Sequence, residues 1–230
     1  MSADRRPYRR ESEETRREAL ISAALDMVAI GGPQAATVRA IADRAGVTPG
    51  LIRHYFASKE ELTRTAYTRL MQRMVADSAA ALENAPSAPL ARLAGFVVAS
   101  VSPPVLDPVS VGLWAGFLHA LRRDASMRAI HSAQYLAFRD ILQDLIADLP
   151  RQCDPARLRR EAIACTAVID GLWLEGSVLP EAFASGEIAA IALDSVGRLL
   201  GVDLALFAPD PAGEALDPAT CLSPSDRNLP

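Results

Sequence analysis

The amino-acid sequence predicts an all-α protein, and three observations support this prediction. Of the 230 residues, 50% are hydrophobic but only 5% are aromatic, a composition typical of packed helices. Apolar residues recur at helical spacing along most of the chain, and Gly or Pro separates the periodic stretches. No segment alternates apolar and polar residues in the manner of a half-buried strand.

The chain is expected to begin with a flexible arm, because residues 1–10 are polar, basic and without periodicity. The first helix is predicted over residues 11–30, with an apolar face of Leu20, Ala24, Met27 and Val28. Gly31-Gly32-Pro33 follows this helix and is expected to end it, since Gly and Pro both disfavour helical continuation.

Residues 37–62 predict two short helices joined by a tight turn. Thr37 is a suitable N-cap for the first helix, whose apolar stripe consists of Val38, Ile41, Ala42 and Ala45. Gly46 follows where a left-handed residue ends a helix at low cost. Thr48 and Pro49 favour a second start, before a stripe of Ile52, Tyr55 and Phe56. This spacing indicates a DNA-reading helix-turn-helix, although an ordinary helical hairpin has similar stripes.

The remaining sequence also reads as helices. Ser58 is predicted to cap a helix over residues 59–83, with Glu61 at the capping-box position. Further helices are predicted at about 88–102, 108–122, 125–149, 155–179 and 186–200, separated by Pro or charged residues. Residues 202–230 are rich in Pro and lack periodicity, so we expect a disordered tail.

Charge and cysteine usage limit the class of protein. The net charge is −4, yet residues 1–64 have a small excess of basic residues, a weak indication of phosphate contact. The three cysteines have no CxxC spacing, and His119 and His131 have no ligand cluster, so no metal is predicted. The charged N-terminus argues against a signal peptide, and no apolar stretch has membrane-spanning length. We therefore expect a cytoplasmic protein without a membrane partner.

The run from Thr37 to Leu62 resembles the DNA-binding domain of the TetR family of bacterial transcriptional repressors. The matching residues are Thr37, Ile41, Ala42, Ala45, Gly46, Val47, Thr48, Gly50, Ile52, Tyr55, Phe56, Lys59 and Leu62. The His54-Tyr55-Phe56 triplet and the Ile-Asp-Gly-Leu-Trp-Leu run at 169–174 resemble one branch, that of the choline-responsive betaine-pathway repressor. Family members commonly have Tyr where this chain has Arg53, so the operator sequence does not transfer.

The resemblance implies a ligand-responsive repressor that binds a palindromic operator as a homodimer and is released by a small-molecule inducer. It implies a helix-turn-helix domain at 11–58 and a helical regulatory and dimerisation domain at 59–201, between the arm and the tail. It implies no catalytic residues and no cofactor. The alternative is a helical small-molecule-binding protein or an enzyme, but the sequence has no GxSxG elbow, phosphate loop or HExxH helix.

Candidate DNA-binding residues come from the motif and from the start of the helix that follows it. Arg53 and His54 are expected on the face opposite the apolar stripe, whereas Tyr55 is expected to have its ring in the core and its hydroxyl free for a phosphate. Arg53 pairs with a guanine edge or contacts a phosphate, and both roles remain open. Thr48 either hydrogen-bonds DNA or serves only as a cap, and Gly50 allows close backbone approach. By the resemblance, Lys59 is a phosphate-binding lysine. The predicted set is Arg39, Thr48, Pro49, Gly50, Arg53, His54, Tyr55 and Lys59.

The ligand site is predicted from a few aromatic residues and an acid within an apolar helix. Aromatic rings beside a carboxylate suit a quaternary ammonium ligand, so the candidates are Trp114, Phe117, Tyr135, Asp170 and Trp173. The alternative is that both Trp residues only fill the core and that Asp170 is hydrogen-bonded at a dimer interface.

By the resemblance, the last two helices form a four-helix bundle with those of a partner subunit. The predicted dimerisation residues are those on their wide apolar faces: Leu158, Ala162, Cys165, Ile169, Leu172, Ile188, Ile191, Val196 and Leu199.

Overall fold

The computed structural model describes residues 6–83 and 85–207, and every regular element in these ranges is helical. The α-helices are α1 (Arg6–Ala35), α2 (Val38–Ala45), α3 (Pro49–Tyr55), α4 (Lys59–Ala80), α5 (Pro89–Ser100), α6 (Pro108–Leu121), α7 (Ala125–Ala147), α8 (Pro155–Val178) and α9 (Glu187–Leu200). Two 3₁₀ turns follow α8 and α9, at Pro180–Ala182 and Ala205–Phe207. The predicted all-α class is confirmed.

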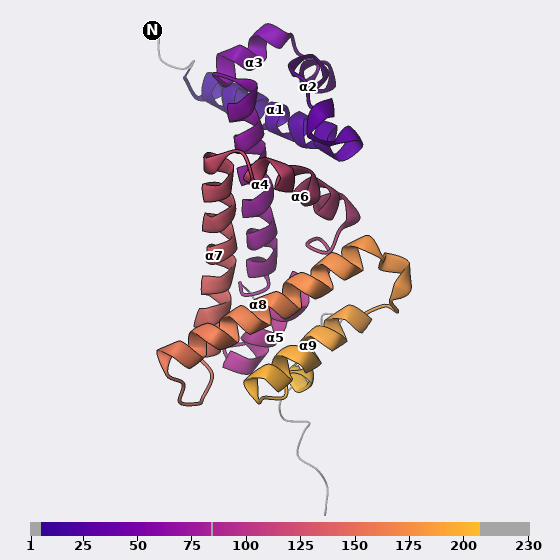
Figure 1. The fold of residues 1–230 in the computed structure, drawn as a ribbon. Coiled ribbons are helices and arrows are strands. Elements are labelled where there is room, and N and C mark those ends of the chain that lie inside the picture. The colour runs from indigo at the N-terminus through magenta and orange to yellow at the C-terminus, as the bar shows by residue number, and fades with distance from the viewer. Residues whose placement is uncertain (1–5, 84, 208–230) are drawn as a thin grey trace, which may run out of the picture.

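The helices form a small head of α1, α2 and α3 on a body of α4 to α9 (Figure 1). Helix α4 begins in the head and runs down into the body, where it lies beside α7. Helices α8 and α9 lie side by side at the other end of the body. The head is therefore joined to the body by a helix that belongs to both.

Helix boundaries follow their caps closely. Asp107, Asp124 and Asp154 each accept hydrogen bonds from backbone N–H groups in the first turn of the helix that follows. Pro occupies the first turn of α3, α5, α6 and α8, where its missing N–H costs nothing.

Helix α1 differs from its prediction at both ends. It begins at Arg6 rather than residue 11, so residues 6–10 of the predicted arm are helical, and residues 1–5 lie outside the described residues. Pro7 suits this early start, because Pro is compatible with a first helical turn. The predicted stop is present as a break: Gly32 has a φ of 73°, and one further turn then continues to Ala35.

The predicted disorder of residues 202–207 is wrong. Leu204 is only 1% exposed, and the turn Ala205–Phe207 packs against α5 and α9. The chain reverses at Gly201, whose φ is 70°. A Cβ at Gly197 would lie 2.6 Å from the carbonyl oxygen of Val202, so the reversal also depends on that glycine. The rest of the predicted tail lies outside the described residues.

Two groups of buried side chains hold the fold together. The head core contains residues of α1 to α4 together with three residues of the body, and includes Leu20, Ile21, Ile41, Ile52, Phe56, Leu62, Tyr67, Leu113, Phe117 and Met127. The body core is formed mainly by α5, α7, α8 and α9, and includes Leu93, Phe96, Val97, Leu142, Ala162, Cys165, Ile169 and Val196. The head core thus extends across the predicted domain boundary at residues 58 and 59.

Candidate nucleic-acid interface and ligand cavity

The turn between α2 and α3 has the geometry that the glycine predicted. Thr37 Oγ1 accepts a hydrogen bond from the Ala40 N–H at 3.1 Å and caps α2. Gly46 has a φ of 66°, the left-handed region. The Gly46 N–H donates to the Asp43 carbonyl at 3.2 Å and the Val47 N–H to the Ala42 carbonyl at 2.9 Å, forming a Schellman motif.

The apolar stripes of the motif are buried against α1 and α4. Ile41, Ala42, Ile52 and Phe56 are each at most 2% exposed. The Arg17 guanidinium lies 5.1 Å from the centroid of the Phe56 ring. An ion pair between Arg44 Nη2 and Asp26 Oδ2, at 2.7 Å, also fastens α2 to α1. The unit is therefore held rigidly in the head.

The predicted DNA-binding side chains lie mostly on the outer side of the motif. Thr48, Pro49, Gly50, Arg53 and His54 are exposed. Thr48 has the extended backbone of an N-cap, but its side chain makes no capping hydrogen bond. A Cβ at Gly50 would approach only Thr48 Oγ1, at 3.9 Å, so packing does not require glycine there.

The other three candidates are placed differently. Arg39 is exposed on α2, with its Nε 4.0 Å from Asp43 Oδ2. Tyr55 is half-buried against the head core, and its ring meets that of His54 edge to face at 5.1 Å. Lys59 is half-buried in the first turn of α4. Binding of DNA by these residues remains a prediction.

The start of α4 confirms the predicted cap. Ser58 Oγ accepts from the Glu61 N–H at 3.1 Å, and Glu61 Oε2 in turn accepts from the Ala57 N–H at 2.6 Å. This reciprocal cap fixes the angle at which α4 leaves the motif, and so it fixes the position of Lys59.

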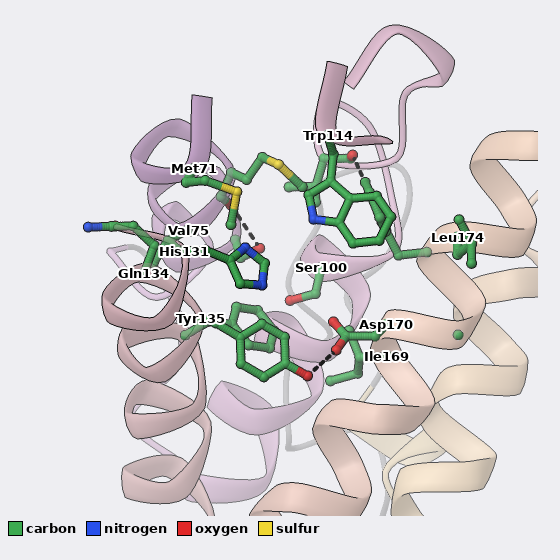
Figure 2. Close-up of a pocket in the computed structure, with 16 residues that line it drawn as sticks. Met71, Val75, Ser100, Trp114, His131, Gln134, Tyr135, Ile169, Asp170 and Leu174 are labelled. Carbon is green, nitrogen blue, oxygen red and sulfur yellow. Dashed lines mark hydrogen bonds between the residues drawn. The ribbon is translucent and has the colours of Figure 1, made fainter. Parts of the chain in front are cut away.

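A cavity of about 440 Å³ lies in the body between α4, α5, α6, α7 and α8 (Figure 2). Its lining is largely apolar, and His131, Tyr135 and Asp170 lie close together and form its polar wall. The lining residues are Met71, Met74, Val75, Ser78, Ser100, Val105, Trp114, His131, Gln134, Tyr135, Phe138, Ile169, Asp170, Gly171, Trp173 and Leu174.

The polar wall is built around Asp170. The Tyr135 hydroxyl donates to Asp170 Oδ2 at 2.5 Å, and Figure 2 shows the two side chains pointing toward each other. The ring of His131 stacks on that of Tyr135 at 5.9 Å, and the Arg139 guanidinium lies 5.1 Å from the Tyr135 centroid. Burial raises the pKa of Asp170, and the hydrogen bond from Tyr135 opposes this increase. Burial lowers the pKa of His131, which favours its neutral ring.

The two Trp residues form a corner of the cavity. Their rings meet edge to face at 5.6 Å. Trp173 is 7% exposed, and its Nε1–H donates to the Val105 carbonyl at 2.9 Å, which fixes the ring. Trp114 is half-buried and also contacts the head core.

Four of the five predicted ligand residues therefore line one cavity, but Phe117 does not. Its side chain is 1% exposed in the head core, with its ring 4.9 Å from that of Tyr67. Of the α7 wall, sequence reasoning found Tyr135 but missed the other three residues. His131, Gln134, Tyr135 and Phe138 follow one helical face at i, i+3, i+4 and i+7, a spacing visible in the sequence.

Five of the nine predicted dimerisation residues are packed inside the protomer, and the dimer face remains a prediction. Ala162, Cys165, Ile169, Ile188 and Val196 are buried inside the protomer, and Leu158 and Leu172 are half-buried against the same body core. Only Ile191 and Leu199 of that set are exposed, at 38% and 44%. The exposed apolar side chains of α8 lie on its opposite face, at Ile163, Leu174 and Val178.

These features define a helix-turn-helix regulator with a ligand-sized cavity in its body. Residues 20–66 match the family described as bacterial regulatory proteins, tetR family, and residues 89–201 match the BetI-type transcriptional repressor C-terminal domain. The chain belongs to the TetR family of transcriptional regulators, with a BetI-type C-terminal domain. It is accordingly not an enzyme.

Curated relatives are similar over most of their length. The HTH-type transcriptional regulator BetI of Burkholderia thailandensis is 28% identical over 187 residues, covering 81% of this chain and 94% of the relative. BetI of Paraburkholderia phymatum is 29% identical over 192 residues, with the same coverage.

Solved structures share the fold. A transcriptional regulator from Pseudomonas aeruginosa PAO1 has a TM-score of 0.74 and 30% identity, covering 85% of this chain and 95% of that chain. A transcriptional regulator from Saccharomonospora viridis in complex with choline has a TM-score of 0.61 and 16% identity, covering 82% and 96%. Within the described residues, no helix combines the length and apolar character needed to cross a membrane.

Proposed function

We propose that this protein is a cytoplasmic repressor that binds a palindromic operator as a homodimer and releases it when a cationic small molecule occupies the body cavity. The observation that carries the proposal is the position of α4. Its first turn holds Lys59 beside the DNA-reading motif, whereas Met71, Met74 and Val75 further along the same helix line the cavity. One rigid element therefore contacts both sites.

The head supplies the groups that reading of DNA requires. Arg53 and His54 are exposed on α3, so they are available to base edges or phosphates. The Thr48 hydroxyl is not used in capping, and the absence of a side chain at Gly50 permits close backbone approach. Lys59 and the first turn of α4 would contact a phosphate.

The dimer would form through α8 and α9. Their outward apolar residues are Ile163, Leu174 and Val178 on α8 and Ile191 and Leu199 on α9. Covering these side chains would remove apolar surface from water, and a two-fold dimer would place two reading heads on the two halves of a palindrome.

The cavity supports a quaternary ammonium ligand. Trp114, Trp173 and Tyr135 offer aromatic faces, and Asp170 offers a carboxylate beside them. A volume of about 440 Å³ lies within the range usual for small-molecule sites. The S. viridis regulator, which has the same fold, was solved in complex with choline, so choline is the first probe.

Release would be a shift between two conformers. A ligand with higher affinity for the conformer whose heads are misplaced for the operator would displace the DNA. Tight binding alone would not do so, because equal affinity for both conformers shifts nothing.

The test begins with an operator duplex selected from a random-sequence library by the purified protein. We expect Arg53→Ala with Lys59→Ala to weaken binding at least about tenfold, and choline to weaken it in the parent protein. Asp170→Asn should lower choline affinity by about tenfold or more, because the carboxylate partner is lost. The neutral isostere 3,3-dimethylbutan-1-ol is the matched control ligand. Failure to select any sequence would refute the repressor proposal, and equal binding of both compounds would refute the cationic ligand.

A further inference from the structure

A buried tyrosine of α4 is hydrogen-bonded to a residue that lines the cavity. Tyr67 is fully buried, and its hydroxyl lies 2.8 Å from Nδ1 of His131. Its ring stacks over that of His131, with centroids 6.4 Å apart and planes 14° from parallel. Burial raises the pKa of Tyr67 to about 12, so the hydroxyl keeps its proton and can donate it to the neutral imidazole.

This contact is one end of a chain that crosses three helices. His131 stacks on Tyr135 within α7, and Tyr135 donates to Asp170 of α8. Figure 2 shows His131, Tyr135 and Asp170 together on the polar wall. The chain therefore runs from a carboxylate inside the cavity to a side chain of α4 that does not line it.

The other cavity hydroxyls do not make such a connection. Ser78 Oγ donates to the Met74 carbonyl at 3.2 Å, and Ser100 Oγ donates to the Phe96 carbonyl at 2.7 Å, each within its own helix. The hydrogen bond between Tyr67 and His131 joins α4 to another helix. None of the other described hydrogen bonds made by cavity-lining side chains does so.

We propose that the Tyr67–His131 hydrogen bond is the contact through which the state of Asp170 reaches the DNA-reading head. This proposal rests on the proposed function and adds the residues that couple its two sites. A cation at Asp170 competes with the Tyr135 hydroxyl for the carboxylate, and a displaced Tyr135 ring no longer supports the stacked His131. Tyr67 then either loses its acceptor or moves with it, and an unsatisfied buried hydroxyl is unfavourable.

Movement of Tyr67 would be transmitted directly to the DNA-reading head. Tyr67 belongs to the head core, which also contains Phe56 at the end of α3 and Leu62 in the first turns of α4. Packed cores respond to such changes by shifting between discrete arrangements rather than by deforming smoothly. Tyr67 and His131 are thus positioning residues, since neither is proposed to contact DNA.

The test is a double-mutant cycle that needs no ligand. The parent protein, Tyr67→Phe, Asp170→Asn and the double variant are compared by amide hydrogen exchange over residues 38–66 and by affinity for the selected operator. We expect Asp170→Asn to change both readouts several-fold in the parent and to change them little once Tyr67 lacks its hydroxyl. The non-additivity should reach about threefold or more, as for residues of one network.

Ser78→Ala is the matched control, because it removes another buried hydroxyl from the same helix. Its effects should add to those of Asp170→Asn. His131→Phe keeps an aromatic ring on Tyr135 but removes the hydrogen-bond acceptor of Tyr67. If Tyr67→Phe folds poorly, His131→Phe takes its place in the cycle, and the same non-additivity with Asp170→Asn is expected.

The proposed coupling would be overturned if the effects of Tyr67→Phe and Asp170→Asn were additive. It would also be overturned if Asp170→Asn changed neither readout. A protein that binds no DNA would refute the repressor proposal, while hydrogen exchange would still decide the coupling. A cycle that shows coupling in a protein without affinity for choline would refute only the ligand class.

Discussion

Tyr135 of α7 and Asp170 of α8 are joined by a 2.5 Å hydrogen bond across the cavity, so the carboxylate has a neutral partner before any ligand binds. The bond is strong enough to orient the acid but does not neutralise it. Burial still raises the pKa of Asp170 above its ordinary value. Burial therefore disfavours the ionised form of Asp170, and a cation entering the cavity would stabilise that form.

This acid predicts the pH dependence of choline binding. The ionised carboxylate binds the cation, so affinity should fall with decreasing pH, and the fall should begin above the usual aspartate range near about 3.9. Protonation of His131 would act in the same direction, although burial places its pKa below the usual value. The Arg139 guanidinium also faces this group of residues, 5.1 Å from the Tyr135 ring centroid. Isothermal titration calorimetry between about pH 5 and pH 8 measures this change in choline affinity.

Two variants separate these groups. His131→Phe should retain the decrease in affinity and Asp170→Asn should abolish most of it. The neutral isostere 3,3-dimethylbutan-1-ol should show little pH dependence. Choline affinity that stays constant over the range would contradict a role for Asp170.

A pair of glycine substitutions should separate folding from DNA reading. Gly46→Ala forces a Cβ into a left-handed conformation with φ of 66°, so it should lower the free energy of unfolding by about 1 kcal/mol. Gly50→Ala enters open space in a helix and should leave that free energy unchanged or slightly higher. It should nevertheless weaken operator binding. Urea unfolding and fluorescence anisotropy measure the two effects, and unaltered operator binding by Gly50→Ala would remove the reason for assigning Gly50 to the interface.

An ion pair in the body predicts a pH-dependent stability. Arg151 pairs with Glu161 and also donates to the Leu200 carbonyl at 3.0 Å, joining the α7–α8 loop to the end of α9. Burial alone would raise the pKa of Glu161, but its bonds to Arg151 and Arg157 bring it below the ordinary value. This stabilisation is present above the unfolded-state pKa and is lost as pH falls through the folded-state pKa.

Glu161→Gln should therefore destabilise the protein by about 2 kcal/mol at neutral pH. The difference from the parent protein should shrink as pH decreases below about 4. The exposed pair of Arg198 and Asp194 is the control, and Asp194→Asn should change stability by no more than about 0.5 kcal/mol. Thermal unfolding across pH follows both, and a difference that grew on acidification would reverse the assigned sign.

Substitutions on the exposed apolar face of α8 and α9 should weaken the proposed dimer. Ile191→Asp with Leu199→Asp should raise the dimer dissociation constant by at least about tenfold and weaken operator binding with it. Leu206→Asp is the control, because Leu206 is 77% exposed but lies outside both helices. Sedimentation velocity measures the assembly. Dimers that tolerate the α9 pair would place the interface elsewhere.

The sequence predicted the helices well because their ends are decided locally. Caps such as Asp107 and Ser58, and the left-handed glycine at position 46, act through neighbours within a few residues. Residues 202–207 were misjudged because Leu204 is held by tertiary contacts that composition does not reveal. The start of α1 was misplaced for a similar reason, since a polar run gives no apolar period to follow.

The sites were predicted less evenly. Trp114 and Phe117 are three residues apart on α6, and spacing alone could not show that the first lines the cavity while the second belongs to the head core. Helix α8 carries apolar residues on two faces, so its period did not distinguish Ile169, which is buried inside, from Ile163, which is exposed. Which face meets which core is a property of the assembled fold.

The head core has a consequence for engineering regulators of this kind. Leu113, Phe117 and Met127, all from the body, complete the core beneath α1 and α4. A chimera that joined residues 6–58 to the body of a relative would replace these three side chains and leave mismatched packing at the junction. Exchange of operator specificity between relatives is thus better attempted by transplanting the exposed surface of α3 than by grafting the whole head.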